Sequence, residues 1–309
     1  MATPSPALLE LLSKVIGGEA STDELLQQVR RQQSACDRTI DAAENETTTT
    51  FSANNFHGSP DEVAKIGGAT IDLGRQSRCG FGEVIFGEGK PAELVTEIIQ
   101  KQLSAGQSAM VTRIESNAAF RVRQAFQHAS HNPVARTLRV SSQPLTTAYP
   151  ISFSAAKTTL HVAIVTAGST DLPVAEEAAE TLAWMGVPCQ RFEDIGVAGP
   201  QRLAAAVPQL RLASAVVVIA GMEGALPAAV AGYLPCPVFA VPTSVGYGAS
   251  LGGLTPLMGM LSSCAANVAV VNIDAGFKGG FLAGMLVRQL EQLRDTSPQE
   301  QATADAHDH

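Results

Sequence analysis

The C-terminal half of the chain alternates short apolar runs with longer segments that have a helical period. The apolar runs read LHVAIVTAG, CQRFEDIG, SAVVVIAGM, PVFAVPTSV and NVAVVNIDAG. Apolar runs without polar alternation are typical of strands buried on both faces, and strands that alternate with helices imply a parallel sheet with right-handed crossovers. We therefore predict an α/β fold with a doubly wound parallel sheet across residues 156–293.

The rest of the chain divides into four segments by composition. Residues 1–45 are predicted to be a helical leader, because their leucines recur on one helical face. Residues 46–64, which are rich in Thr and Asn, are predicted to be a flexible linker. Residues 65–150 mix short apolar runs with helical stretches and predict a smaller N-terminal α/β domain. Residues 294–309 have no core-forming period and are expected to be a disordered tail.

Charge and cysteine usage narrow the classes of function. A net charge of -8 and a pI of about 5.3 leave no basic field for a polyanion, so we expect no nucleic-acid partner. The sequence has no apolar run of membrane-spanning length and does not start like a signal peptide, which predicts a cytoplasmic protein without a membrane partner. The 5 cysteines form no CxxC pair, so we predict no metal site and expect any important cysteine to act singly.

Ligands of doubly wound sheets bind at the carboxyl ends of the strands, where this chain carries TAGSTDLP. Gly168, Ser169 and Thr170 would offer backbone N–H groups and hydroxyls to a phosphate, and Asp171 would take a ribose hydroxyl. The alternative is that Asp171 is a simple helix N-cap before Pro173. No GxGxxG is present here, so hydride transfer from a dinucleotide loses its main support.

A second strand end, AGMEG, places Glu223 just past a strongly apolar strand, after Gly221 and Met222. Partial desolvation there would raise the pKa of its carboxyl group, which suits a proton acceptor. The alternative is a solvated loop residue or a first-turn helix charge.

Cys264 is the candidate nucleophile, in the segment LMGMLSSCAANVAVVNID beside Ser263. From sequence alone a lone cysteine is more often a small buried hydrophobe. The carboxyl end of a helix, where Cys264 is expected, does not by itself favour the thiolate.

Several segments together resemble the LarB family, the pyridinium-3,5-biscarboxylic acid mononucleotide synthases of nickel-pincer cofactor biosynthesis. They are DLGRQSRCGFGEVIFGEGK, TAGSTDLPVAEEAAE, DIGVAG, AGMEGALPAAVAG and VPTSVGYGASLGGLTPLMGMLSSCAANVAVVNIDAGFKGG. The C-terminal part is similar in turn to the PurE-type carboxyaminoimidazole ribonucleotide mutases and carboxylases. The resemblance implies a flavodoxin-like, PurE-like fold and a homo-oligomer, an octamer in the PurE type.

The resemblance also implies a reaction. Its substrates would be nicotinic acid adenine dinucleotide and carbon dioxide or bicarbonate, and its products the biscarboxylated pyridinium mononucleotide and AMP. No tightly bound cofactor is implied, and Mg²⁺ is a candidate helper in anhydride cleavage. Cys264 would add to the pyridinium ring and Glu223 would take the ring proton after carboxylation. Arg202, Ser263, Asn272 and Asp274 would complete the substrate-binding set.

Other interpretations stay open at this stage. One is an aminoimidazole ribonucleotide carboxylase or mutase, which has no use for Cys264, and another is a nucleotide-binding regulator without turnover. Gln201 replaces a histidine expected from the family, and a glutamine cannot shuttle protons, which weighs against the purine reaction. Arg75, Arg78 and Lys90 would form an N-terminal phosphate site or a surface charge cluster. The stretch GGLTPLMGMLSS would be a subunit contact or an intrachain core helix.

Overall fold

The computed structural model describes residues 63–145 and 151–296. All the described residues belong to one compact unit. The predicted leader, nearly all of the predicted linker and the tail after residue 296 lie outside the described residues.

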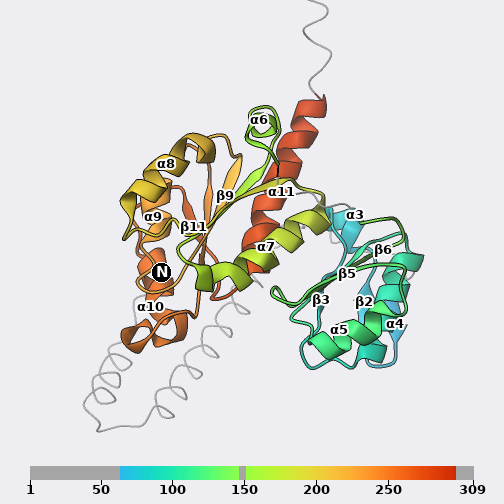
Figure 1. Ribbon diagram of the computed structural model, residues 1–309. Helices are drawn as coiled ribbons and strands as arrows, with labels where there is room; N and C mark the ends of the chain where they lie inside the picture. The colour runs from blue at the N-terminus through green and yellow to red at the C-terminus, as the bar shows by residue number, and fades with distance from the viewer. Residues whose placement is uncertain (1–62, 146–150, 297–309) are drawn as a thin grey trace, which may run out of the picture. The chain divides into compact units, whose positions relative to one another are not determined.

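The C-terminal domain is built on a five-stranded sheet in which every pair of neighbours is parallel. Its strands are β7 (Val162–Thr166), β8 (Cys189–Phe192), β9 (Ala215–Ala220), β10 (Val238–Pro242) and β11 (Val268–Val270). They lie in the order β11-β10-β9-β7-β8 (Figure 1), the flavodoxin-like order with its topological switch point between β7 and β9. The predicted doubly wound fold is confirmed.

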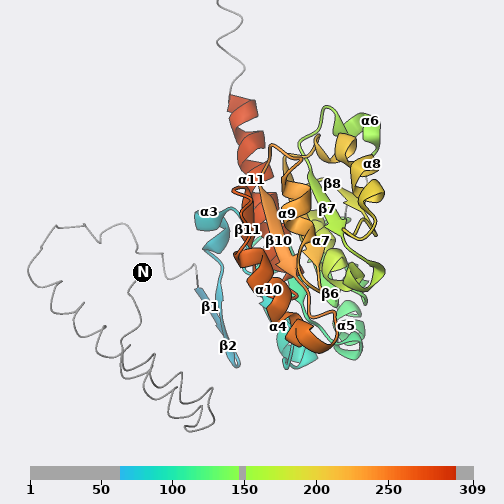
Figure 2. The ribbon, with the colours of Figure 1, turned by 90° about the vertical axis from the view of Figure 1, so that its left-hand side faces the viewer.

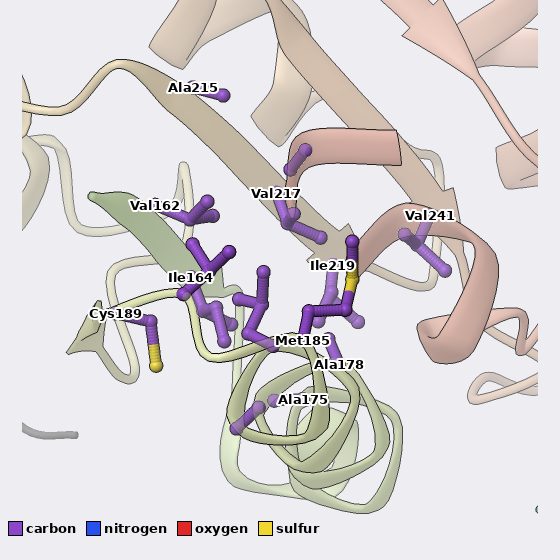
Figure 3. Packing of buried hydrophobic residues seen from close by; sticks show 14 of the residues in the cluster. Val162, Ile164, Ala175, Ala178, Met185, Cys189, Ala215, Val217, Ile219 and Val241 are labelled. Carbon is purple, nitrogen blue, oxygen red and sulfur yellow. The ribbon is translucent and has the colours of Figure 1, made fainter. Parts of the chain in front are cut away.

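Helices cover both faces of this sheet, as Figure 1 shows. The helices on one face are α7 (Leu172–Met185) and α11 (Gly276–Thr296), and on the other α8 (Pro200–Leu210), α9 (Leu226–Ala231) and α10 (Leu254–Leu261). Side chains alternate along a strand, so Val217 and Ile219 of β9 enter the first core, while Val216 and Val218 enter the second. Figure 3 shows the first core, in which the strand valines and isoleucines meet the small residues of α7.

The predicted smaller N-terminal α/β domain is present, and the structure shows that its sheet is mixed. Its order is β3-β4-β6-β5, with bounds Ile85–Phe86, Ala109–Thr112, Thr137–Ser141 and His128–Asn132, and β3 and β4 are the parallel pair. Helices α4 (Ala92–Ser104) and α5 (Ser116–Arg123) share its core. A hairpin of β1 (Val63–Ile66) and β2 (Ala69–Asp72) and the short α3 (Arg75–Cys79) precede it.

Helix α7 joins the two domains through buried charges. Nε of Arg139, on β6, lies 2.5 Å from Oε2 of Glu180, on α7, and both side chains are buried. Asn132 donates to Glu176 (2.8 Å) and to Glu180 (3.3 Å), so polar groups from both domains satisfy one another at this contact. In the part of the chain that the structure describes, no helix is long and apolar enough to cross a membrane.

A candidate active site at the strand ends

A cavity of about 260 Å³ opens at the carboxyl ends of β7 and β9, which is the switch point where ligands of such sheets bind. Backbone and side chains from four strand ends and the helices that follow them form its wall. The lining residues are Ala167, Gly168, Thr170, Asp171, Gly196, Val197, Ala198, Arg202, Ala220, Gly221, Met222, Glu223, Ala225, Leu226 and Val245.

The turn after β7 is held by Asp171. This residue is 3% exposed and ends the short 3-10 helix Ser169–Asp171. Its Oδ2 accepts the N–H of Gly168 at 3.0 Å and its Oδ1 accepts the hydroxyl of Thr243 at 2.8 Å. Burial raises the pKa of this carboxyl group, although the two hydrogen bonds oppose the rise. Asp171 therefore shapes the turn through its own hydrogen bonds, while Gly168 and Thr170 face the cavity and Ser169 is exposed outside its lining.

The turn after β9 depends on glycine. A Cβ on Gly221 would overlap the carbonyl oxygen of Val245, and Met222 has a φ of 55°, which is uncommon for a residue with a side chain. Glu223, the next residue, lines the cavity but is exposed. The partial desolvation expected for its carboxyl group is therefore not present in a single chain.

Arg202 supplies the cationic side chain of this cavity. It lies in the first turn of α8, and its Nη1 is 2.6 Å from Oδ2 of Asp194. The pair is exposed, so the guanidinium can exchange this partner for an anion at small cost. Gln201, which takes the place of the family's expected histidine, is exposed and outside the lining, and none of the lining residues is a histidine.

Cys264 lies in the segment between α10 and β11 and is exposed. It does not line the cavity. The segment is fixed by Asn267, whose side-chain amide donates to the carbonyl groups of Ala231, Leu234 and Cys236 at 3.1 to 3.3 Å. By contrast, burial raises the pKa of the Cys189 thiol to about 12. Among the described cysteines, an accessible thiol is therefore found at Cys264 and at Cys79.

Helix α10 connects the Cys264 segment to Glu223. A Cβ on Gly259 would lie 2.6 Å from the carbonyl oxygen of Glu223, so only glycine allows this close approach without a shift of the backbone. An open groove of about 460 Å³ runs along the helix; it is lined by Glu223, Leu251, Leu254, Thr255, Met258, Gly259 and Ser262. Glu223 therefore borders both the strand-end cavity and this groove, whose lining reaches Ser262, two residues before Cys264 in the chain. Figure 2 shows α10 beside β10.

The remaining predicted residues lie elsewhere. Ser263 accepts the N–H of Ala265, and the exposed Asn272 accepts the N–H of Ile273, so both hydrogen bonds stabilise local turns. Asp274 accepts the N–H of Ser244 and lines a second cavity, which also contains Arg113 and Arg136. These two arginines were not predicted from the sequence.

The three residues predicted for an N-terminal site do not line a described cavity with Glu223 or Arg202. Arg78 pairs with Asp72 at 2.5 Å on the surface, and Nζ of Lys90 donates to the carbonyl oxygen of Phe86 at 2.7 Å. Arg75 is exposed on α3. This arrangement favours the surface-cluster alternative.

The fold and the cavity define a flavodoxin-like α/β protein with a strand-end site suited to a small anionic ligand. Within residues 63–145 and 151–296, no group of three His, Cys, Asp or Glu side chains is arranged to hold a metal ion. Residues 63–143 match the family of LarB/PurE-like N-terminal domains, and residues 161–307 match the AIR carboxylase domain. The chain belongs to the LarB family, with a PurE-like C-terminal domain, and is thus a member of the AIR carboxylase-like enzymes.

Two individual proteins are similar to this chain. An uncharacterised protein of Methanocaldococcus jannaschii is 36% identical over 225 residues, which cover 71% of this chain and 83% of that protein. A crystal structure of a Treponema denticola PurE2 variant shares 18% identity with a TM-score of 0.36, and the match covers 48% of this chain and 98% of that one.

Proposed function

We propose that this protein carboxylates the pyridinium ring of nicotinic acid adenine dinucleotide at C5 and releases AMP, giving pyridinium-3,5-biscarboxylic acid mononucleotide for nickel-pincer cofactor biosynthesis. The observation that carries the proposal is the position of Glu223, which borders the strand-end cavity and also the groove whose lining includes Ser262, two residues before the exposed Cys264. Membership of the LarB family supports the choice of substrate.

A thiol and a carboxylate are sufficient for the carboxylation. The pyridinium ring is electron-poor, so C5 cannot attack carbon dioxide until a nucleophile adds to the ring. Addition of the Cys264 thiolate gives an enamine-like dihydropyridine, and its C5 forms a bond to the carbon of carbon dioxide. Glu223 then takes the C5 proton, the C–S electron pair leaves with sulfur, and the ring is aromatic again. Water adds to the phosphoanhydride in a separate step that yields AMP.

The nicotinate half of the substrate would bind in the strand-end cavity. Its ribose phosphate would accept N–H groups near Gly168 and Thr170 and pair with Arg202, which supplies the positive charge there. The ring would then lie toward Met222 and Glu223. Ser169, Ser263 and Asn272 would contribute only after a movement of their turns, because they do not line the cavity.

The groove along α10 is open in a single chain, and we infer that a second copy of the chain covers it. Four large apolar residues on this face are exposed by 47 to 67%: Leu251, Leu254, Met258 and Leu261. An apolar patch of this kind next to a reactive pair is suited to a subunit contact. Covering it would remove water from Glu223 and provide the desolvation that a single chain lacks. An octamer of the PurE type is the assembly that we propose.

The decisive test is incubation with nicotinic acid adenine dinucleotide and carbon-labelled bicarbonate, followed by mass spectrometry of the products and of the protein. The wild type is expected to give a labelled pyridinium mononucleotide and AMP, and Cys264→Ala is expected to give no labelled product. Glu223→Gln should slow carboxylation by about 100-fold or more, since it removes the proton acceptor. Cys79→Ala is the matched control, because it removes the other exposed thiol and should leave the rate unchanged.

A specific result would replace the proposal by the aminoimidazole ribonucleotide reaction. The match of residues 161–307 to AIR carboxylase makes this the second candidate. In a parallel incubation with aminoimidazole ribonucleotide as substrate, label found only in the imidazole product, at a rate that Cys264→Ala does not change, would establish it. The lack of a histidine among the residues that line the cavity argues against it.

A further inference from the structure

A second cavity of about 210 Å³ adjoins the strand-end cavity, and Thr170 and Val245 line both. The N-terminal domain contributes Arg113 and Arg136 to its wall, and the C-terminal domain contributes Pro173, Val174, Glu177 and Asp274 among others. Each cavity alone is smaller than the roughly 300 to 1,000 Å³ of sites that enclose a drug-sized ligand, whereas the two together fall within that range.

The two arginines of this second cavity are held by the ends of neighbouring strands. Arg113 follows β4 and Arg136 precedes β6, and the N–H of Ile114 donates to the carbonyl oxygen of Arg136 at 2.9 Å. Their φ angles are 55° and 54°, a left-handed conformation that residues with side chains adopt rarely and that the surrounding structure must enforce. The backbone conformation therefore fixes the direction in which both arginine side chains leave the main chain.

Both guanidinium groups keep donors for a further partner. Arg113 donates through Nη2 to the carbonyl oxygen of Asp274 at 2.5 Å, and its Nε lies 3.5 Å from Oε1 of Glu177. Arg136 pairs with the exposed carboxylates of Glu115 at 2.8 Å and Glu88 at 3.5 Å. A guanidinium carries five N–H donors, more than these contacts use, and its planar fork matches two oxygens of a phosphate.

The carboxylates around the cavity limit where an anion can sit. Glu177 is buried and accepts the N–H of Phe277 at 3.1 Å, and Asp274 accepts the N–H of Ser244 at 2.8 Å. Both carboxylates therefore accept hydrogen bonds on the side of the cavity formed by the C-terminal domain, and their negative charge would repel a phosphate there. An anionic ligand would bind at the arginines of the N-terminal domain, and an apolar surface at Pro173 and Val174 would remain for its organic part.

We propose that this second cavity binds the adenylate half of the dinucleotide, with Arg113 and Arg136 holding its phosphate while the nicotinate half occupies the strand-end cavity. The inference rests on the proposed function for the identity of the dinucleotide. It gives the N-terminal domain the role of binding the leaving nucleotide, and the shared wall at Thr170 marks where the phosphoanhydride would cross from one cavity to the other.

The test is calorimetric titration of the full chain with AMP and, separately, with nicotinate mononucleotide. The two nucleotides should bind together, and Arg136→Ala should weaken AMP binding about tenfold while leaving nicotinate mononucleotide binding unchanged, as expected for one lost charged hydrogen bond. Arg121→Ala is the control, because Arg121 lies in the same domain and also has an exposed glutamate partner, Glu93. Arg113→Lys, which keeps a charge but loses the fork, should weaken AMP binding as well.

Three results would overturn the proposal: no AMP binding at millimolar concentration, AMP binding that Arg136→Ala leaves unchanged, or competition between the two nucleotides for one site. The outcome does not depend on turnover. A protein that binds AMP through Arg136 but does not label the pyridinium ring would retain this site and lose the proposed function.

Discussion

The two faces of the five-stranded sheet differ in how they are completed. On the face of α7 and α11, the apolar core is continued by Phe81 of the N-terminal domain, whose ring lies 5.8 Å from Trp184 and 5.5 Å from Phe281. Beside it, the buried pair of Arg139 and Glu180 joins the two domains. On the face of α8, α9 and α10, the core is equally well buried, but α10 presents its outer apolar side chains to solvent.

The face of α7 and α11 is therefore finished within the chain, whereas the face of α8, α9 and α10 is left unfinished, with exposed apolar side chains where we propose a subunit contact. The finished face carries the buried, hydrogen-bonded pair of Arg139 and Glu180, and Pro173, Val174 and Glu177 of its helix α7 line the second cavity. Glu223 lies on the unfinished face, and the exposed Cys264 follows the α10 groove in the chain; these are the two residues proposed for chemistry. Binding and rigidity would thus be provided by one chain, while exclusion of water from the reacting groups would require assembly.

The largest expected effect on stability comes from breaking the finished face. Glu180→Ala leaves the Arg139 charge buried without this carboxylate, which should lower the free energy of unfolding by about 3 to 5 kcal/mol. Urea denaturation followed by circular dichroism measures it. Glu93→Ala, at the surface pair with Arg121, should change stability by less than about 0.5 kcal/mol. Equal effects of the two variants would show that the buried pair does not hold the domains together.

The next largest expected effect is on subunit assembly through the unfinished face. Met258 is 55% exposed, so Met258→Glu should change the stability of a single chain little but should bury a charge in any subunit contact made by α10. We expect the assembly to dissociate at least tenfold more readily, as measured by light scattering across a dilution series. Leu293→Glu is the control, because Leu293 is 64% exposed on α11, on the opposite face. If Leu293→Glu caused dissociation and Met258→Glu did not, the subunit contact would lie on the face of α11 and not on that of α10.

The sequence alone predicted the sheet and part of the site, because these features depend on residues that are close to one another in the chain. All five strands were predicted because an apolar run and the glycine turn after it are neighbours in the chain, and this also located Gly168, Thr170, Asp171, Gly221 and Glu223 at strand ends. The second cavity was missed because its contact between Arg113 and Asp274 joins residues 161 positions apart, and no local pattern records such a pair. The exposure of Glu223 agrees with the solvated loop residue that the sequence left open as the alternative, and the expected desolvation of its carboxyl group is not found in a single chain.

The smallest expected effect lies between the two faces, at Asp171. Burial raises the pKa of its carboxyl group above the ordinary value of 3.8, so the protonated form is favoured by folding. This contribution to stability is full below the unfolded pKa and is lost as the pH rises through the folded pKa. The free energy of unfolding of the wild type should therefore fall relative to that of Asp171→Asn as the pH is raised from about 4 toward neutrality.

Urea denaturation at intervals across that range measures the difference between the two proteins. Thr243→Val should steepen the fall, because the Thr243 hydroxyl donates to Oδ1 of Asp171 and stabilises the charged form. A difference that stays constant with pH would contradict the prediction, because the hydrogen bonds from Gly168 and Thr243 to the Asp171 carboxylate would then offset the whole cost of its burial.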